Sequence, residues 1–566
     1  MFIENIEKVK SPIIYITLSF MVSSVFYGIF DEYRWLAFFS ASLFFIFIVL
    51  NTNKEFFVVI FVLFLIGIVI NSNFYRVNLQ EKFIGTIRVV EEKSYYNIVE
   101  YRGKRVKVNS KKNLELGDRA KISGVFKKDI NKEDGTVGTL EIENQKVLNK
   151  DILGNIYYIR KKVYNKLKEN LGQRKAALVS SLSFGYSEFL DTEDKEDMRN
   201  LGIIHAISVS GLHVSIIFLS LKKLFGNKFA IVLSCLYVIL TGIPFSSLRA
   251  LIMIVCSSSA ISLRKSYNPL GGLSLSALII ILLKPYAIFQ LGFILSFGAT
   301  LGIILFSNKI SRYLYKLPKY IANTIALSIG AQAFTLPVMI IAFREFSMWF
   351  LIGNILVIPI LNFIIILGNL GMVISFIPSI FDFFSFVLLK SIDLLDYLIE
   401  ELYAFSNTSF ISHKSLAIVY MSMLISFYFI CKGHKKFIAF PIISFFCVSI
   451  FIYSPFLKFD YLREGGLLLS YRGERTIVTN KRNIDIGKLK KENLAQSSIL
   501  EGKNIRISDN IKLKSNNKNF ILKLNEDEYL LRINNRSKIE ENCDIIDFVE
   551  GNVRGIIILD NKIFTY

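Results

Sequence analysis

The stretch with the greatest potential for chemistry is Leu201 to Val214, which reads LGIIHAISVSGLHV. Two of the chain's four histidines, His205 and His213, lie in this stretch. It also contains Ser208, Ser210 and Gly211. The apolar residues between them predict a membrane helix that starts near residue 203. Polar and ionisable side chains at such a depth usually face a bundle interior or a water-filled path. This stretch is therefore the first candidate for a functional site.

The spacing of the two histidines does not suit a shared metal ion. They are eight positions apart, which is about 80° around a continuous helix and ~12 Å along it. No metal or other cofactor is predicted here. Two interpretations stay open on spacing alone. Either the polar residues line a path through the bundle, or the serines and glycine pack helix against helix while the histidines bond buried carbonyls.

A second candidate is Pro244–Ala250, PFSSLRA, which places Arg249 a few residues inside an apolar run. A charge at a helix centre costs roughly 2.5–3.5 kcal/mol, and less near the interface, where arginine can snorkel. The functional alternative is a cation beside the path of a polyanion. Ser246 and Ser247 are predicted to pack helices or to line a pore.

Two further segments carry small or helix-breaking residues. In Gln290–Ala299, Gly292, Ser296 and Gly298 are expected to let neighbouring helices approach closely. In IGNILVIPIL, Asn354 and Pro359 are expected either to break a helix and free backbone groups for a cavity, or to form a simple kink.

A membrane bundle must position these residues. Hydrophobic residues make up 52% and charged residues 20% of the 566-residue chain, and the mean hydropathy is +0.46. The five cysteines form no CxxC pair, so neither a zinc site nor a disulfide framework is expected. We predict a polytopic α-helical membrane protein of about 13 spans. The expected spans lie near residues 12–30, 36–50, 56–73, 203–221, 228–243, 247–263, 269–285, 288–307, 320–342, 347–361, 363–380, 414–431 and 437–455.

Soluble parts interrupt this pattern. Short alternating runs separated by turn residues predict a small antiparallel β domain of five or six strands, compatible with an OB-like barrel. Residues 151–171 resemble an amphipathic helix at the membrane surface, and the acidic segment 381–405 is expected to be amphipathic or interfacial. The tail is expected to be β-rich. The predicted regions are 1–75 (three spans), 81–148 (β domain), 151–200 (helical linker), 201–456 (membrane channel domain) and 458–566 (C-terminal β domain).

The basic loops predict the topology. With the N-terminus in the cytoplasm, strict alternation puts five basic loops inside, as the positive-inside rule requires. The β domain and the tail then both lie outside. This assignment depends on dividing residues 347–380 into two spans. The loops are marked by Lys54, by Lys222/Lys223/Lys228, by Arg264/Lys265, by Lys309/Arg312/Lys316/Lys319 and by Lys432/Lys435/Lys436. The net charge of +21 therefore does not by itself indicate a nucleic-acid partner.

Four segments together resemble the ComEC-type competence family, bacterial inner-membrane proteins that pass single-stranded DNA into the cell. HAISVSGLHV, PFSSLRA, QLGFILSFGATLGI and GNILVIPIL occur in this order. SLSFGYSEFLD, at residues 181–191, resembles the segment that precedes the family signature. The resemblance covers residues 1 to about 455. It implies a DNA uptake channel, not an enzyme, that works with single-stranded DNA and with other competence proteins, including a DNA receptor and a cytoplasmic ATPase. The chain has no Walker motif, so the energy for translocation is expected to come from a partner ATPase or from the proton gradient.

The tail departs from the family pattern. Many members end in a metallo-β-lactamase-like domain, whose metal cluster needs several histidines. No histidine follows His434, so the tail is expected to be at most a degenerate remnant without hydrolytic activity. Lys284 stands where an acidic residue is common.

The resemblance implies a role for the basic and aromatic residues of the β domain. A single strand needs a cationic groove and aromatic faces for stacking. The DNA-capture candidates are Tyr95, Tyr96, Tyr101, Arg102, Lys104, Arg105 and Lys107; a solvated charged face is the alternative. Rival functions for the whole chain are a transporter or export channel for another solute and a noncatalytic membrane scaffold.

Overall fold

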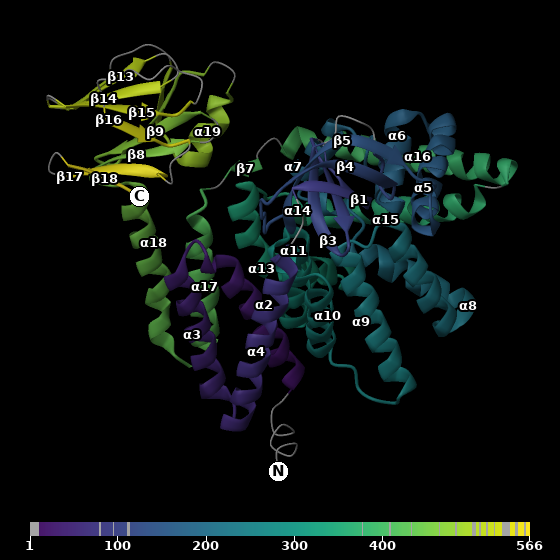
Figure 1. Ribbon diagram of the computed structural model, residues 1–566. Helices are drawn as coiled ribbons and strands as arrows, with labels where there is room; N and C mark the ends of the chain where they lie inside the picture. Colours follow the sequence, from purple (N-terminus) through teal and green to yellow (C-terminus); the bar gives the residue numbers. More distant parts are fainter. Residues whose placement is uncertain are drawn as a thin grey trace. The chain divides into compact units, whose positions relative to one another are not determined.

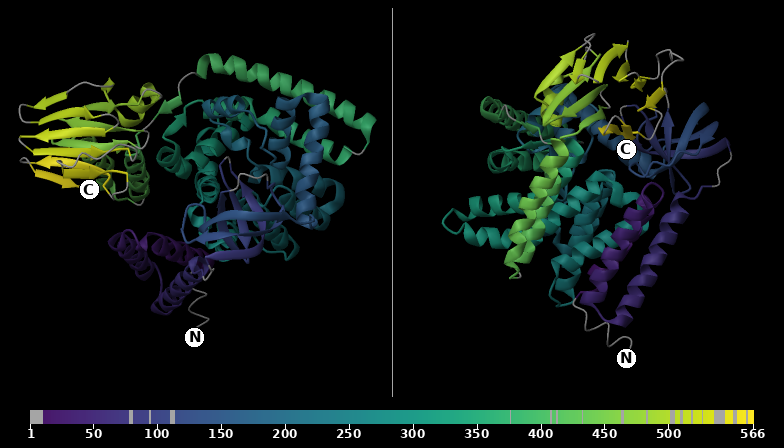
Figure 2. Two further views of the ribbon diagram at one scale, coloured as in Figure 1. Left: turned by 45° about the horizontal axis from the view of Figure 1, so that its top comes forward. Right: turned by 90° about the vertical axis from the view of Figure 1, so that its left-hand side faces the viewer.

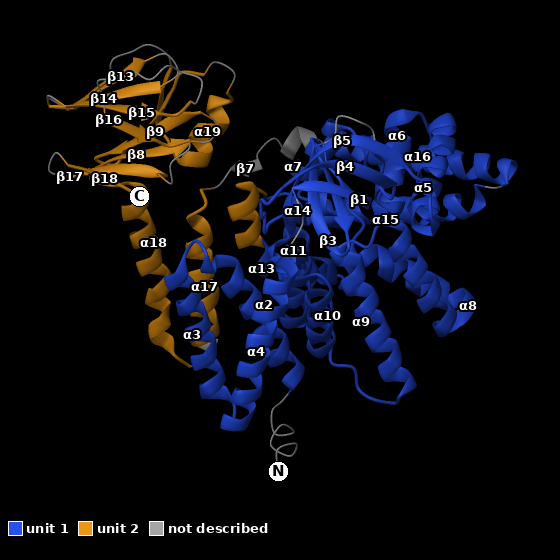
Figure 3. Ribbon diagram, in the orientation of Figure 1, with its two compact units in different colours: residues 1–335, 347–408 blue, residues 336–346, 409–566 orange. Residues whose placement is uncertain are grey.

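The computed structural model divides the chain into two compact units (Figure 3). Unit 1 comprises Met1–Thr335 with Ser347–Thr408, and unit 2 comprises Leu336–Phe346 with Ser409–Tyr566. The structure describes residues 11–77, 81–93, 95–109, 114–375, 377–406, 409–411, 413–431, 433–462, 465–481, 484–500, 505–508, 511–516, 519–525, 527–534, 544–549, 553–559 and 562–566. The predicted basic residue Lys432 and the cysteine Cys543 lie outside these ranges.

Unit 1 begins with three apolar helices, α2 (Pro12–Phe30), α3 (Arg34–Asn51) and α4 (Lys54–Tyr75) (Figure 1). They coincide with the first three predicted spans, and each is long and apolar enough to cross a membrane. Their few polar residues bond one another or a backbone carbonyl: Ser19 Oγ donates to Ile60 O at 2.9 Å, and Asn71 Nδ2 donates to Ser24 Oγ at 3.0 Å. Such pairing removes the cost of polar groups inside an apolar bundle.

A five-stranded closed barrel follows, in the order β1-β2-β3-β5-β4. Its interior is filled by aliphatic residues such as Ile87, Val99 and Val106. The prediction of a purely antiparallel domain is wrong in one pair, because β3 and β5 run parallel. An odd number of strands cannot alternate direction all the way round a closed ring, so at least one pair must be parallel. The strands are β1 (Lys82–Glu92), β2 (Asn97–Tyr101), β3 (Lys104–Asn109), β4 (Arg119–Lys127) and β5 (Thr136–Val147).

Three helices connect the barrel to the next membrane region: α5 (Ile152–Leu171), α6 (Gln173–Phe184) and α7 (Thr192–Asn200). Asp151 caps α5, since its side chain accepts a hydrogen bond from the Gly154 amide. α5 and α6 bury their apolar faces in one core with the later helices α15 (Ile358–Ile374) and α16 (Pro378–Ser406). The segment 151–171 is therefore a packed helix of this core and not an isolated surface helix.

The long helix α8 (Gly211–Leu240) is a hairpin. Gly226 interrupts it with φ 75° and ψ 174°. A straight helix of this length would span ~45 Å, yet the residues that flank its two ends both lie beside Gly185. A Cβ on Gly185 would be 3.1 Å from the Val209 side chain and 3.5 Å from the Thr241 carbonyl oxygen. The predicted spans 203–221 and 228–243 correspond to its two arms, but the first arm starts only at residue 211.

The rest of the bundle contains α9 (Phe245–Ser262), α10 (Pro269–Leu283), α11 (Leu291–Gly302), α12 (Asn308–Tyr313), α13 (Lys319–Phe343) and α14 (Phe350–Leu356). Short turns η2 (Pro285–Phe289) and η3 (Ile303–Ser307) flank α11. α14 and α15 are bent by 48° at Val357, as a broken span or a re-entrant loop. The predicted division of 347–380 near residue 362 is therefore wrong: the break lies at residue 357, and the first part is a single short helix.

The protein is a multi-pass membrane protein with fewer full-length spans than predicted. Among the described residues, eight helices are long and apolar enough to cross, or nine with the bent pair, and α10 and part of α17 (Leu416–Cys431) are shorter apolar helices. The second arm of α8 and the short α14 account for the remaining two of the 13 predicted segments. If the bent pair crosses once, every later segment changes side. If it is re-entrant, the predicted topology is unchanged.

Unit 2 consists of a helical hairpin and a β domain. The hairpin is α17 and α18 (Ala439–Ile452), with the turn η4 (Lys435–Ile438) between them. The β domain has two layers, a six-stranded sheet of order β11-β10-β9-β8-β17-β18 and a five-stranded sheet of order β12-β13-β14-β15-β16 (Figure 2). The two sheets share one core that includes Phe459, Phe520 and Ile556. The tail is therefore β-rich, as predicted.

Its strands are β8 (Leu457–Leu462), β9 (Gly466–Tyr471), β10 (Glu474–Thr479), β11 (Ser497–Leu500), β12 (Ile505–Ser508), β13 (Ile511–Asn516), β14 (Asn519–Leu524), β15 (Asp527–Arg532), β16 (Asp544–Asp547), β17 (Gly555–Leu559) and β18 (Lys562–Thr565), with the helix α19 (Ile486–Asn493) between β10 and β11. Two short strands, β6 (Glu345–Ser347) and β7 (Ser409–Ile411), pair outside the β domain.

Candidate functional site at the start of helices α8 and α9

The segment before α8 is not helical, which corrects the expected membrane helix from residue 203. Residues 204–206 form a single 3-10 turn, η1 (Ile204–Ala206), and the α-helix begins at Gly211. Ser210 caps it: its Oγ accepts from the Leu212 amide at 3.2 Å, and its own amide donates to Nδ1 of His213 at 3.0 Å. These bonds satisfy backbone donors that the first helical turn would leave free. Side-chain capping, which hydropathy does not register, therefore decides where the helix starts.

The two histidines consequently occupy different environments. His213 is 1% exposed, and its Nδ1 lies 2.8 Å from Ser210 Oγ. Its Nε2 faces the Leu182 backbone and forms no well-formed hydrogen bond with any described residue. His205 lies exposed in η1, and Ser208 nearby is exposed as well. The two rings do not line one side of a continuous helix, so the expectation based on helical geometry was wrong.

The guanidinium of Arg249 lies against the first residue of α8. A Cβ on Gly211 would stand 2.6 Å from Arg249 Nη2 and 3.2 Å from the Ala250 side chain, so a residue without a side chain is needed for this approach. Nε of Arg249 is buried, with no hydrogen-bond partner in the described part of the chain. The N-terminus of a helix carries a partial positive charge, and a cation beside it is unfavourable unless an anion joins them. The arrangement therefore suits an anion.

The two serines of PFSSLRA hold this geometry together. Ser246 Oγ donates to the Val209 carbonyl at 2.9 Å, and Ser247 Oγ lies 3.4 Å from the same oxygen. They tie the first turn of α9 to the residues just before α8. The structure thus brings Ser210, Gly211, His213 and Arg249 to one place from two separate sequence motifs.

The small residues expected to pack helix against helix differ in how closely their neighbours approach them. Around Gly292, a Cβ would meet nothing within 4 Å, so close packing at this glycine is not observed. A Cβ on Gly298 would be in ordinary contact with Phe334 of α13. The closest approach lies almost three helical turns beyond Gly292, where a Cβ on Gly302 would overlap the carbonyl of Gly330. Ser296 Oγ is buried without a hydrogen-bond partner among described residues.

The break expected at Asn354 and Pro359 is observed. Pro359 stands in the first turn of α15, directly after the bend at Val357. Asn354 Nδ2 donates to Ser328 Oγ at 2.9 Å, which ties α14 to α13. The Asn354 carbonyl oxygen is buried without a partner in the described ranges.

A further cation, Arg160, is more deeply buried than Arg249, and no sequence motif singled it out. It lies in α5, is 2% exposed and donates from Nη1 to the Phe184 carbonyl at 3.4 Å. The same Nη1 would be 4.0 Å from a Cβ on Gly242, in the turn between α8 and α9. Burial lowers the pKa of Arg160 to about 10. In the sequence, Arg160 stands at helical spacing from the apolar residues Ile156, Val163 and Leu167, and this position could have indicated its burial.

This geometry lies inside the part of the chain that matches known proteins. The family model described as Competence protein matches residues 182–436, slightly less than half of the chain. Residues 182–436 are a competence-protein region. The match includes His205, Gly211, His213, Arg249 and Asn354 and excludes the barrel and α5.

Two curated relatives match at lower coverage. ComE operon protein 3 of Bacillus subtilis (strain 168) is 27% identical over 219 residues, which is 37% of this chain and 28% of that protein. The uncharacterized protein MG316 of Mycoplasma genitalium is 35% identical over 123 residues, 20% of this chain and 31% of that protein. The chain therefore matches less than a third of the length of either relative. No solved structure matches it significantly.

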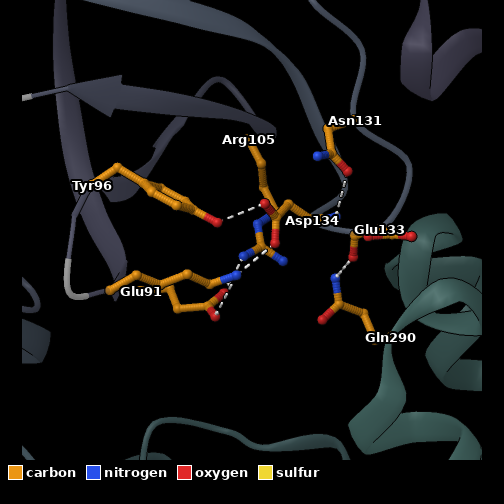
Figure 4. Close-up of polar contacts among 8 residues, drawn as sticks. Glu91, Tyr96, Arg105, Asn131, Glu133, Asp134 and Gln290 are labelled. Atoms are coloured by element: carbon orange, nitrogen blue, oxygen red, sulfur yellow. Dashed lines mark hydrogen bonds and ion pairs between the residues drawn. The ribbon is translucent and has the colours of Figure 1, made fainter. Parts of the chain in front are cut away.

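Outside the competence-protein region, several DNA-capture candidates are engaged in contacts within unit 1. Arg105 pairs with Glu91 (Figure 4), and its guanidinium lies 4.6 Å from the centre of the Tyr286 ring in η2. Tyr96 donates to Asp134 at 2.8 Å, as does Lys93 at 2.5 Å. Burial alone would raise the pKa of Asp134, but these two bonds lower it below its ordinary value.

The remaining capture candidates differ in exposure. Lys104 donates to the Asn73 carbonyl at 2.6 Å, and Lys107 lies 4.3 Å from the Tyr96 ring. Tyr101 packs on Phe83, with 4.8 Å between the ring centres. Tyr95 is 92% exposed, and Arg102 is exposed at the β2–β3 turn, over the Tyr101 ring. Figure 4 also shows Gln290 of the bundle donating to the backbone of Glu133. The barrel thus uses Lys104 and Arg105 to dock on the bundle and leaves Tyr95 and Arg102 accessible.

Proposed function

We propose that this protein takes part in DNA uptake during competence and passes a single DNA strand across the bacterial cytoplasmic membrane. The observation that carries the proposal is Arg249. Its guanidinium lies at the N-terminus of α8, with a buried Nε that has no partner among described residues. A partly buried cation without a carboxylate partner carries a desolvation cost, and a passing phosphate would offset that cost. The match of residues 182–436 to competence proteins supports the same conclusion.

The path proposed for the strand runs past two cations. Arg249 meets the phosphate at the start of α8, while Arg160 stands beside the turn at Gly242 that joins α8 to α9. Ser210 and His213 cap α8 and fix the position of its first turn, beside which the guanidinium of Arg249 lies. His205 and Ser208 are exposed before this turn and are proposed to meet the strand earlier. Ser246, Ser247, Ser296, Asn354 and Pro359 shape the surrounding helices.

The barrel is proposed to be an OB-like module that delivers the strand. The observed order of its strands supports this assignment. Tyr95, Tyr101 and Arg102 supply an aromatic surface and a cation for a single strand. Because the interaction is largely electrostatic, affinity for single-stranded DNA is expected to fall steeply as salt rises.

The remaining parts of the proposal concern placement and partners. The barrel and the C-terminal domain are proposed to lie outside the cytoplasm, where DNA arrives. The chain is proposed to act as a conduit without enzymatic activity or cofactor, and to depend on a DNA receptor and a cytoplasmic ATPase. A re-entrant α14–α15 pair is part of the same proposal, since it preserves the predicted side of the tail.

The test compares Arg249→Gln with Arg264→Gln in a deletion strain. Arg264 is an exposed arginine after α9, so both variants lose one charge. A hydrogen bond to a charged group contributes about 1.5–3 kcal/mol, so Arg249→Gln is expected to lower transformation by about 10- to 100-fold. Arg264→Gln should behave as wild type at equal membrane abundance.

Two outcomes separate the rival functions. Normal transformation in the deletion strain would exclude DNA uptake and favour transport of another solute. If deletion abolishes transformation and the Arg249→Gln variant restores it fully, the result would favour a scaffold. The chain would then be needed for transformation, but the guanidinium of Arg249 would not.

A further inference from the structure

The C-terminal β domain buries a row of polar side chains on one face of its six-stranded sheet. Arg475 on β10 stands directly opposite Ser470 on β9, and Ser470 stands opposite Lys458 on β8. All three are buried, at 4%, 2% and 7% exposure. Directly opposed side chains of neighbouring strands lie in contact range. The row is therefore a continuous polar strip inside the protein.

The strip is incompletely hydrogen bonded. Nε and Nη1 of Arg475 and Oγ of Ser470 form no hydrogen bond with any residue that the structure describes. The nearby carboxylate, Asp460, is engaged by Lys458 at 3.2 Å and by the Tyr566 hydroxyl. Asp460 interacts electrostatically with Arg475 but accepts a hydrogen bond from neither Nε nor Nη1. Buried donors without acceptors are costly, so the geometry points to a further anionic partner beside Arg475 and Ser470.

Further basic residues lie near Arg475. His413 interacts electrostatically with Arg475, Arg344 and Lys414, and with the carboxylate of Asp460. Arg344 bonds Glu492 at 2.7 Å and keeps 27% of its side chain exposed, so the cluster reaches the surface there. The three cations Arg344, Lys458 and Arg475 thus outnumber the two carboxylates Asp460 and Glu492. An excess of positive charge remains for a ligand.

The cluster lies where apolar helices end. Arg344 directly follows α13, Lys414 stands two residues before α17, and Lys458 stands six residues after α18. These helices are apolar and of membrane-spanning or nearly membrane-spanning length. Cationic residues at such ends lie at the level of the lipid headgroups. The Lys458 ammonium also lies 4.5 Å from the ring of Phe451, in the last turn of α18.

We propose that Arg475, Ser470 and His413 form a binding site for the phosphate group of an anionic phospholipid headgroup. Arginine presents several donors in a fixed fork that matches phosphate oxygens, and the Ser470 hydroxyl adds a further donor. The headgroup would complete the buried strip and fix the β domain to the membrane surface.

The experiment measures thermal unfolding of the full-length protein in a neutral detergent with four separate additions. These are phosphatidylglycerol, phosphatidylcholine, inorganic phosphate and a single-stranded oligonucleotide. A ligand that binds only the folded state raises the unfolding midpoint. Phosphatidylglycerol is expected to raise it more than phosphatidylcholine, and Arg475→Met should lose most of that difference. Ser470→Ala, which keeps the fold with little change of volume, should lose part of it.

The matched control is Arg472→Met, which removes an exposed arginine from the same hairpin and should keep the full difference. The proposal is overturned if Arg475→Met and Ser470→Ala both keep the wild-type response to phosphatidylglycerol. It is also overturned if millimolar inorganic phosphate alone gives the same Arg475-dependent shift, since the ligand would then be a free ion. An Arg475-dependent shift produced only by the oligonucleotide would assign the site to nucleic acid instead.

Discussion

Arg249 Nη2 would stand 2.6 Å from a Cβ atom placed on Gly211, although the two residues are 38 positions apart in the chain. The glycine therefore does more than start α8, because it makes room for a guanidinium at the helix N-terminus. Replacing it tests the geometry of the site without removing any charge.

Gly211→Ala is expected to displace the Arg249 side chain and to lower transformation by about tenfold, which corresponds to ~1.4 kcal/mol of lost interaction. Alanine is a better helix former than glycine, so the amount of inserted protein should not fall. Transformation frequency normalised to membrane abundance is the measurement. Full activity of the alanine variant would show that the close approach is not needed.

Gly302→Ala should destabilise the bundle, because the added Cβ would overlap the Gly330 carbonyl. Overpacking of this kind typically costs about 1–3 kcal/mol. Gly292→Ala is the matched control, since nothing lies within 4 Å of a Cβ there. Unfolding midpoints in detergent should fall for the first variant only. An equal fall for both would contradict the packing described for Gly302 and Gly330.

Arg105→Ala is expected to loosen the barrel from η2. The variant loses the Glu91 pair and the contact with the Tyr286 ring, and a contact of an arginine with an aromatic ring contributes about 0.5–2 kcal/mol. Arg102→Ala, at an exposed turn, should leave the unfolding midpoint unchanged but weaken single-stranded DNA binding at low salt. The reverse pattern would assign docking to Arg102 and DNA contact to Arg105.

Acid should destabilise unit 2 through His413. Burial, together with the nearby Arg475 and Arg344, lowers its pKa to about 4, whereas an unfolded histidine has a pKa near ~6.5. Between pH ~4 and pH ~6.5, His413 therefore binds more protons in the unfolded chain than in the folded one. The contribution of neutral His413 to the stability of unit 2 is complete above pH ~6.5 and is lost as the pH falls towards ~4. His413→Gln should reduce the drop in unfolding midpoint between pH 7 and pH 5, measured in neutral detergent without anionic lipid. An unchanged drop would exclude His413 as its source.

Local patterns predicted most of the elements but not their ends or their partners. Apolar runs located the first three helices, and turn residues located the barrel, because these signals extend over many neighbouring residues. The start of α8 depends on the Ser210–His213 bonds and on the Val209 carbonyl held by Ser246. Hydropathy registers none of these, so it placed the helix about eight residues too early.

Long-range contacts explain the other differences. Gly292 and Gly302 are both helical glycines in sequence, and only the position of Gly330 on α13 distinguishes them. Arg160 was not singled out because residues 151–171 were considered alone as an amphipathic helix, whereas its burial is created by α6 and by the turn at Gly242. The capture residues Arg105 and Lys104 likewise acquire partners from η2 and α4.

The fold of α8 has a mechanical consequence. Its two arms meet at Gly185 and turn back at Gly226, so the hairpin is held at its base. Near the turn, Leu224, Phe225 and Phe229 remain exposed on the protein surface. An element fixed at one end behaves like a cantilever: a small rotation at the Gly185 end produces its largest displacement at the tip. Lys222, Lys223 and Lys228 flank the turn, so the tip would move at the membrane–water boundary, where their ammonium groups stay hydrated.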